Sequence, residues 1–248
     1  ASERIIGDAT KEDVLIVGSG GGNDVAGALR RNIGNIDAVE IDPGIYKLGL
    51  TLHPEHPYLD SRVHIYIDDA RSFFKKAKKK YDVISFGLLD SHTLSSSYNN
   101  IRLDHYIYTS ESFKEAKSLL KDNGIMTVAF AATRTWISAR ITGLLKEAFG
   151  QEAPYFTISP YGNNILNRGW IMYVASNDMA ALKERIKSQI KLSSYIESHK
   201  IILDGEKVKL TFQNNGGAPH NLIIEGLGVS TKTIGAGKTD IIEFTAPA

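Results

Sequence analysis

The chain has 248 residues, of which 42% are apolar, and a net charge of +1. This length fits one large domain or a domain with a small appendage, and the apolar fraction suffices for a buried core. The balanced charge gives no reason to expect a nucleic-acid partner, and the absence of cysteine excludes disulfides, thiolate catalysis and thiolate metal sites.

Neither a targeting segment nor a membrane segment is evident in the sequence. The apolar runs stay below the ~18–20 residues that a membrane-spanning helix needs, and no signal peptide precedes the first expected strand. We therefore expect a cytoplasmic protein with no membrane partner. Because the chain begins at Ala1 rather than at methionine, we also expect an excised fragment or a processed product.

The first informative motif is an apolar run that leads into a glycine-rich turn. Residues 14–17 have the composition of a strand buried in a parallel sheet. Gly18, Gly20 and Gly22 follow, and glycines let the backbone turn sharply and approach a ligand closely. Glu40 lies in the next expected strand, 22 residues past Gly18. At that distance an acid can bind both ribose hydroxyls of a nucleotide-like cofactor.

The residues after the glycines narrow the choice of cofactor. The dinucleotide fingerprint needs a glycine at position 23, but this chain has Asn23 followed by Asp24. Acids in the first helical turn would repel a pyrophosphate and suit a cofactor with a positive centre and no phosphate. S-adenosylmethionine is such a cofactor. The alternatives are NAD or FAD, and a glycine turn that binds no ligand.

Expected strands and helices alternate as far as about residue 191. The strands cover residues 14–17, 37–41, 63–67, 83–86, 125–130, 155–158 and 170–175. The helices cover residues 23–32, 44–50, 70–78, 111–121, 135–149 and 179–192, and Asn123-Gly124 is the expected end of the fourth helix. This alternation predicts an α/β fold with helices on both faces of a parallel sheet. The last two strands indicate a hairpin, and one antiparallel strand at the edge of a seven-stranded sheet resembles the Rossmann-like fold of methyltransferases.

Two acids follow the third expected strand, at the edge of the sheet where the ligands of open α/β folds lie. Asp69 is our candidate to accept a hydrogen bond from an adenine amino group, because Asp68 can cap the helix that follows. The alternative is that the acid at this position is only a helix cap.

A long polar loop follows the fourth expected strand and covers residues 87–108. Loops of this length in a compact domain are usually lids or binding loops, or are disordered. Asp90 and His92 are our catalytic candidates, because either side chain can act as a base or orient a substrate amine or hydroxyl. For His92, a surface or capping role is an equal alternative.

With these motifs in view, residues 12–150 resemble the spermidine synthase family. The likeness rests on the glycine turn and on four further stretches, Val39-Glu-Ile-Asp42, Asp68-Asp-Ala70, Tyr81-Asp-Val-Ile84 and Tyr108-Thr-x-Glu-x-Phe113. The resemblance implies that Glu40 holds the ribose and Asp69 the adenine of S-adenosylmethionine or its decarboxylated form. Gly20 and its neighbours would line the methionine-derived part. The resemblance also implies a small amine or polyamine as the acceptor, and relatives in this family are often homodimers.

The segment after the fourth strand departs from that family. The family has Asp-Ser-Ser-Asp there, and the first Asp is the proposed base for the attacking amine. This chain has Gly87-Leu-Leu-Asp90 instead. The base position is therefore Gly87, and Asp90 takes over only if the loop shifts. The family's N-terminal β-domain, which helps to close the polyamine pocket, is also missing from this sequence.

The pattern changes after about residue 195. Short expected strands at residues 207–212, 222–224 and 241–244 predict a small all-β segment over residues 203–248, separate from a spermidine synthase-like domain of residues 1–195. Residues 207–248 resemble the first half of a cupredoxin, in which the His of Pro-His-Asn is a copper ligand. That ligand position maps to His220. Without a cysteine this chain alone cannot form a blue-copper site, so we expect His220 to be a turn residue and no metal to be bound.

Three functions compete at this point. The first, which we favour, is a transferase that moves a methyl or aminopropyl group from a sulfonium donor to a small nucleophile such as an amine. The second is a module that binds the cofactor without turnover, which Gly87 favours. The third is a copper or electron-transfer role for the tail, as part of a longer protein. Methyl transfer and aminopropyl transfer both stay open.

Overall fold

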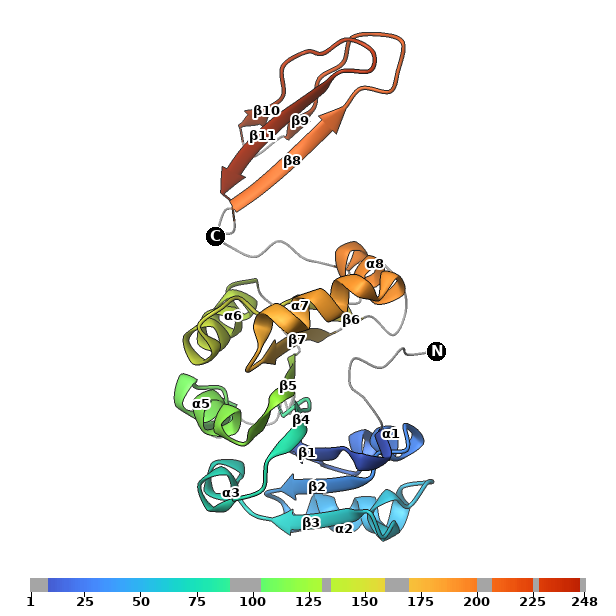
Figure 1. The fold of residues 1–248 in the computed structure, drawn as a ribbon, viewed down its shortest axis with the longest axis vertical. Coiled ribbons are helices and arrows are strands. Elements are labelled where there is room, and N and C mark those ends of the chain that lie inside the picture. Colours follow the sequence, from blue (N-terminus) through green and yellow to red (C-terminus); the bar gives the residue numbers. More distant parts are fainter. Residues whose placement is uncertain are drawn as a thin grey trace. The chain divides into compact units, whose positions relative to one another are not determined.

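The computed structural model describes residues 9–89, 104–130, 135–158, 170–199, 207–224 and 228–245. The chain forms two compact units, one of residues 1–133 and 140–200 and the other of residues 134–139 and 201–248 (Figure 1). Within the described segments, every helix is too short or too polar to cross a membrane.

The first unit is built on a seven-stranded sheet in the order β3-β2-β1-β4-β5-β7-β6. Its strands, in chain order, are β1 (Asp13–Val17), β2 (Asn35–Glu40), β3 (Val63–Ile67), β4 (Tyr81–Phe86), β5 (Leu120–Phe130), β6 (Tyr155–Ile158) and β7 (Trp170–Ser176). Strands β1 to β5 run parallel, whereas β7 runs antiparallel to both of its neighbours, β5 and β6. The predicted Rossmann-like α/β class with a mostly parallel sheet is confirmed. The expected place of the antiparallel strand was wrong by one position, because β6 returns along the outer side of β7.

Helices connect these strands. They are η1 (Ala9–Lys11), α1 (Asn23–Arg30), α2 (Pro43–Leu52), η2 (Pro57–Leu59), α3 (Ala70–Lys76), α4 (Asp104–Ile107), α5 (Ser110–Ser118), α6 (Thr135–Phe149), α7 (Met179–Ser188) and α8 (Ile190–Ser198), of which η1 and η2 are short 3-10 helices. The expected helix over residues 179–192 is two helices, because Gln189 leaves helical geometry at φ −98° and ψ 88°.

The expected end of the fourth helix at Asn123-Gly124 was also wrong. Helix α5 already ends at Ser118, and both residues lie in β5. The N–H of Tyr81 donates to the carbonyl oxygen of Leu119 at 2.8 Å, which draws the chain into the sheet directly after the helix. A Cβ atom at position 124 would lie 2.8 Å from the carbonyl oxygen of Tyr81. Glycine is therefore needed there for the close approach of β4 and β5, not to end a helix.

Both faces of the sheet are covered by apolar side chains. On one face, Val14 and Ile16 of β1 pack with residues of β2, with Val25 of α1 and with Tyr58 of η2. On the other face, the ring of Phe86 in β4 lies 5.9 Å from that of Phe74 in α3 and 5.6 Å from the ring of Phe113 in α5. Burial on both faces explains why residues 14–17 are a continuous apolar run rather than an alternating one.

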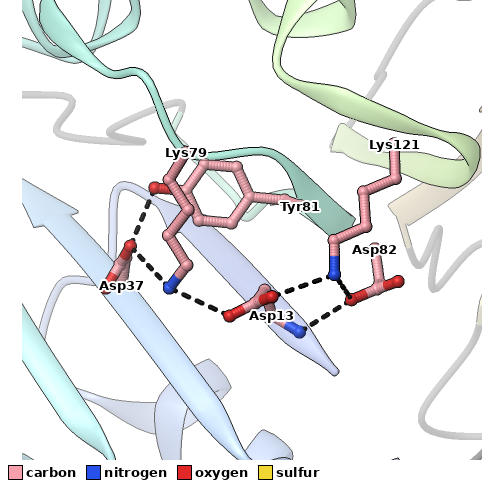
Figure 2. Close-up of polar contacts among 6 residues, drawn as sticks. All are labelled: Asp13, Asp37, Lys79, Tyr81, Asp82 and Lys121. Carbon is pink, nitrogen blue, oxygen red and sulfur yellow. Dashed lines mark hydrogen bonds and ion pairs between the residues drawn. The ribbon is translucent and has the colours of Figure 1, made fainter. Parts of the chain in front are cut away.

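A cluster of charged and phenolic groups joins the amino ends of the central strands. We call it the amino-end cluster, and its members are Asp13, Asp37, Lys79, Tyr81, Asp82 and Lys121 (Figure 2). Lys79 Nζ lies 3.1 Å from Asp13 and 3.2 Å from the buried carboxylate of Asp37. Lys121 Nζ lies 2.9 Å from Asp13 and 2.7 Å from Asp82. The hydroxyl of Tyr81 donates to Asp37 at 2.8 Å. Each carboxylate of the cluster therefore meets a lysine.

The second unit is made of short antiparallel strands. Strand β8 (Lys207–Gln213) pairs with β11 (Thr239–Thr245), and β9 (Ile223–Ile224) pairs with β10 (Val229–Ser230). The side chain of Asn214, which is buried, donates to the carbonyl oxygens of Ala218 and Ile234 and holds the loop that follows β8. His220 is exposed and forms an isolated antiparallel bridge with Ile234. The resemblance of this segment to a cupredoxin stays a prediction.

Candidate functional site

The glycine-rich turn leaves β1 at the carboxyl edge of the sheet. Gly18, Gly20 and Gly22 have φ angles of +68°, +54° and +99°, which side chains other than glycine rarely adopt. A Cβ atom at position 22 would lie 2.8 Å from Cγ of Pro57. At positions 20 and 21, by contrast, a Cβ atom would meet no atom within 4 Å. The turn is therefore closed where it meets η2 and open along its middle, where a ligand can approach the backbone.

Glu40 ends β2 beside this turn, and its side chain is buried. One carboxylate oxygen, Oε2, accepts the N–H of Gly20 at 2.7 Å, and the other, Oε1, accepts the N–H of Asp42 at 2.9 Å. Each carboxylate oxygen has a further lone pair. The backbone therefore fixes the orientation of Glu40 and leaves it able to accept two more hydrogen bonds, as a ribose diol requires.

Tyr58 of η2 holds the turn from the other side. Its hydroxyl lies 2.7 Å from the carbonyl oxygen of Gly20 and 2.9 Å from Oγ of Ser19. Helix α2 also packs closely against the turn, because a Cβ atom at position 49 would lie 2.5 Å from the carbonyl oxygen of Gly21. The sequence analysis missed both contacts. An aromatic residue after Pro57 and a glycine within a helix are weak signals, and neither points to residues some thirty positions away.

The helix cap after β3 is supplied by the second of the two acids, not by the first as expected. Asp69 is the N-cap of α3, and its Oδ1 accepts the N–H of Ser72 at 2.9 Å. Asp68 instead accepts the N–H of Asp69 at 2.9 Å and pairs with Lys76 at 2.9 Å. The expectation that Asp68 caps the helix was therefore wrong. The cap uses one oxygen of Asp69, so its proposed hydrogen bond to adenine stays a prediction that depends on the other oxygen.

Gly87 follows β4, and its N–H donates to the carbonyl oxygen of Val17 at 3.3 Å. A Cβ atom at position 87 would lie 2.7 Å from Oδ2 of Asp24 and 3.7 Å from the carbonyl oxygen of Gly18. The carboxylate of Asp24, from the first turn of α1, thus reaches the space beside Gly87. Partial desolvation raises the pKa of the Asp24 carboxyl.

The structure brings the glycine turn, Glu40, Asp69 and Asp24 to the carboxyl edge of strands β1 to β4. The catalytic candidates Asp90 and His92 lie outside the described residues, so their roles stay predictions. Within the described part of the chain, no group of three or more His, Asp or Glu side chains is placed to hold a metal ion.

A comparison with protein-family models gives one match over most of the chain. Residues 6–185 match the spermine/spermidine synthase domain. Over 125 residues the chain is 34% identical to a polyamine aminopropyltransferase of Buchnera aphidicola, and the match covers 49% of this chain and 41% of that relative. The chain thus spans less than half the length of this curated relative.

Two solved structures are similar in fold. A spermidine synthase in complex with the transition-state analogue AdoDATO has a TM-score of 0.56 at 14% identity, and the match covers 77% of this chain and 65% of that one. Human methyltransferase-like protein 13 in complex with SAH has a TM-score of 0.51 at 19% identity, and the match covers 77% of this chain and 84% of that one. At these identities the likeness shows the fold alone.

Proposed function

The chain belongs to the spermine/spermidine synthase domain family, and from this premise we propose that its first unit binds decarboxylated S-adenosylmethionine and transfers the aminopropyl group to a small amine. The observation that carries the proposal is the orientation of Glu40. Its carboxylate is fixed by the N–H groups of Gly20 and Asp42, with acceptor capacity left for two ribose hydroxyls.

The surroundings of Glu40 support an adenosyl ligand. Ile41 follows it directly and is 50% exposed, so an apolar side chain is available to pack against the face of a purine. Asp69 lies after the neighbouring strand β3 and keeps one carboxylate oxygen for the adenine amino group. The open middle of the turn at Gly20 and Gly21 leaves room for the chain that carries the sulfonium.

The charge of the site supports a cationic donor. Among the described residues, neither Glu40 nor Asp24 forms an ion pair with lysine or arginine. A sulfonium and an ammonium group add positive charge, which two unpaired carboxylates favour electrostatically. Transfer then consists mainly of holding the amine in line with the carbon–sulfur bond, because positioning alone contributes much of such a rate enhancement.

Aminopropyl transfer rather than methyl transfer is supported by the name of the curated relative, a polyamine aminopropyltransferase. Gly87 supports a second candidate function, a module that binds the donor without turnover. A glycine after β4 supplies no base, and a protonated amine has no lone pair with which to attack.

Incubation with a panel of diamines tests the proposal. The first unit would receive decarboxylated S-adenosylmethionine or S-adenosylmethionine, and mass spectrometry would detect aminopropylated or methylated amines. We expect an aminopropylated product with at least one diamine, and a rate at least about tenfold lower for Glu40→Gln. As a matched control, Asp178→Asn should leave the rate unchanged, because asparagine is an equally good N-cap for α7. Donor binding without any product would contradict the transferase and support the binding module.

A further inference from the structure

Of the acids described at the carboxyl edge of the sheet, one has no partner in the described part of the chain. Among the described residues, Asp24 forms no hydrogen bond and no ion pair, although it lies in the first turn of α1. The other four acids that the structure describes at this edge are engaged. Asp42 caps α2, Asp69 caps α3, Asp68 pairs with Lys76, and Glu40 accepts two backbone N–H groups.

The carboxylate of Asp24 lies beside Gly87, where a residue other than glycine would have its side chain. Oδ2 of Asp24 lies 2.7 Å from the point where a Cβ atom of residue 87 would be, so Asp24 reaches the space that any side chain at the end of β4 would fill. Strands β1 and β4 are neighbours, and ligands of open α/β sheets lie beyond the carboxyl ends of such strands. Asp24 from the helix thus places an acid where the strand supplies none.

The negative charges of Asp24 and Glu40 both act on the hydroxyl of Tyr58. Desolvation contributes most to the raised pKa of the Tyr58 hydroxyl, and the charges of Glu40 and Asp24 both add to it. Glu40, Tyr46 and Asp24 all act electrostatically on Tyr58, and His53 contacts Asn23, the neighbour of Asp24, at 3.2 Å. Asp24 is exposed and lacks a counter-ion among the described residues, so its carboxylate is free to meet a bound cation.

We propose that Asp24 binds the ammonium group of the acceptor amine and accepts its proton. The inference rests on the proposed function only for the transfer step that follows. A proton passes from the ammonium to the Asp24 carboxylate and leaves a neutral amine with a lone pair. That lone pair forms a bond to the aminopropyl carbon next to sulfur, the carbon–sulfur bond breaks, and its electron pair stays on sulfur as a neutral thioether. The alkylated nitrogen keeps its positive charge as a secondary ammonium group, and Asp24 releases the accepted proton to solvent, which restores the carboxylate.

Calorimetric titration with 1,4-diaminobutane tests this assignment without relying on turnover. The diamine would be added to the whole chain, alone and with saturating 5′-methylthioadenosine. We expect the wild-type chain to bind the diamine and Asp24→Asn to bind it at least about tenfold more weakly. The affinity of Asp24→Asn for 5′-methylthioadenosine should stay at the wild-type level, and Asp178→Asn should bind the diamine as tightly as the wild-type chain. Equal diamine affinity in Asp24→Asn, or no binding to the wild-type chain, would overturn the inference.

A double variant tests whether diamine binding needs a carboxylate at this place or Asp24 in particular. Adding Gly87→Asp to Asp24→Asn returns a carboxylate to the same space from β4, and we expect diamine affinity to recover in part. A double variant that folds but binds as weakly as Asp24→Asn would overturn the assignment. We also expect the diamine affinity of the wild-type chain to weaken as the pH falls through the raised pKa of Asp24. Asp24→Asn should lack this pH dependence.

The two proposals fail in different ways. Diamine binding that depends on Asp24, with no aminopropylated product, would contradict the proposed function and leave the amine site standing. Product formation at the wild-type rate by Asp24→Asn would contradict the amine site and leave the proposed function standing.

Discussion

The carboxylates at the two ends of the central sheet have different partners. At the amino end, Asp13, Asp37 and Asp82 each meet a lysine at 2.7–3.2 Å (Figure 2). At the carboxyl end, Asp68 pairs with Lys76, but among the described residues Glu40 meets only backbone N–H groups and Asp24 meets no partner. Lysines that bridge carboxylates fix the strands relative to one another, whereas carboxylates without a lysine are expected where a ligand of the opposite charge binds. The difference therefore separates a structural end of the sheet from a binding end.

The largest expected effect is the loss of Asp37 from the amino-end cluster. Asp37→Ala leaves Lys79 with one partner fewer and the buried hydroxyl of Tyr81 without an acceptor. We expect the free energy of unfolding to fall by about 2–4 kcal/mol, measured by urea denaturation, with unchanged affinity for 5′-methylthioadenosine. A variant that loses ligand affinity but not stability would contradict the division between the two ends.

A pair of charge-neutralising variants should change stability in opposite directions. Desolvation opposes the shift, but hydrogen bonds from Lys121 and Lys79 lower the pKa of Asp13 in the folded chain. Asp13 therefore stabilises the fold above the unfolded pKa near 3.8, and this contribution is lost as the pH falls through the lowered value. Asp24 has a raised pKa, so its ionisation costs stability as the pH rises through that value.

We expect Asp13→Asn to lower the free energy of unfolding at pH 7 by about 1–2 kcal/mol and Asp24→Asn to raise it slightly. The Asp24 difference should vanish at the acid end of the profile, where the native carboxyl is also neutral, and the Asp13 difference should shrink towards that end. Thermal unfolding between pH 3 and pH 8 measures them. Changes of the same sign at pH 7 would contradict the comparison, because they would place both acids in balanced surroundings.

A smaller effect is expected where an uncharged group supports the binding end. Tyr58→Phe removes the hydroxyl that contacts Ser19 and the carbonyl oxygen of Gly20. Stability should fall by about 1 kcal/mol, and the affinity for 5′-methylthioadenosine should fall severalfold because the turn is less firmly held. Calorimetry and denaturation of the same variant give both values. A variant with full stability and full affinity would show that the turn is fixed without Tyr58.

The smallest effect is expected for an ion pair at neither end. Lys146 and Glu152 lie 3.0 Å apart with both side chains exposed. Glu152→Ala should change the free energy of unfolding by less than about 0.5 kcal/mol, by the same denaturation assay. A loss comparable to that of Asp37→Ala would mean that pairing alone, rather than burial of the pair, stabilises the amino-end cluster.

Much of the fold could be predicted because local signals and tertiary structure agree. The apolar run at residues 14–17, the three glycines and Glu40 each mark one step of a strand, a turn and a second strand, and those steps lie where the structure places them. The role of Gly124 could not be predicted, because it depends on the close approach of Tyr81 from another strand. The break at Gln189 has no glycine or proline to mark it in the sequence.

The candidate site was predictable to the same extent. Glu40 and the glycines follow a spacing rule along the chain, whereas the contact between Asp24 and Gly87 joins residues from two elements whose closeness only the folded sheet sets. The sequence identified Gly87 as a departure from the family but gave no sign that an acid from α1 reaches the same space. The swapped cap at Asp69 has a similar origin, because either of two adjacent acids satisfies the same sequence rule.

Calorimetric titration of decarboxylated S-adenosylmethionine into the wild-type chain, Glu40→Gln and Asp178→Asn tests the central claim most directly. The claim is that the carboxyl end of the sheet is a binding site for an adenosyl sulfonium ligand centred on Glu40. We expect binding to the wild-type chain and to Asp178→Asn with equal affinity, and binding at least about tenfold weaker to Glu40→Gln. Equal affinity of all three chains, or no binding to any of them, would contradict the claim.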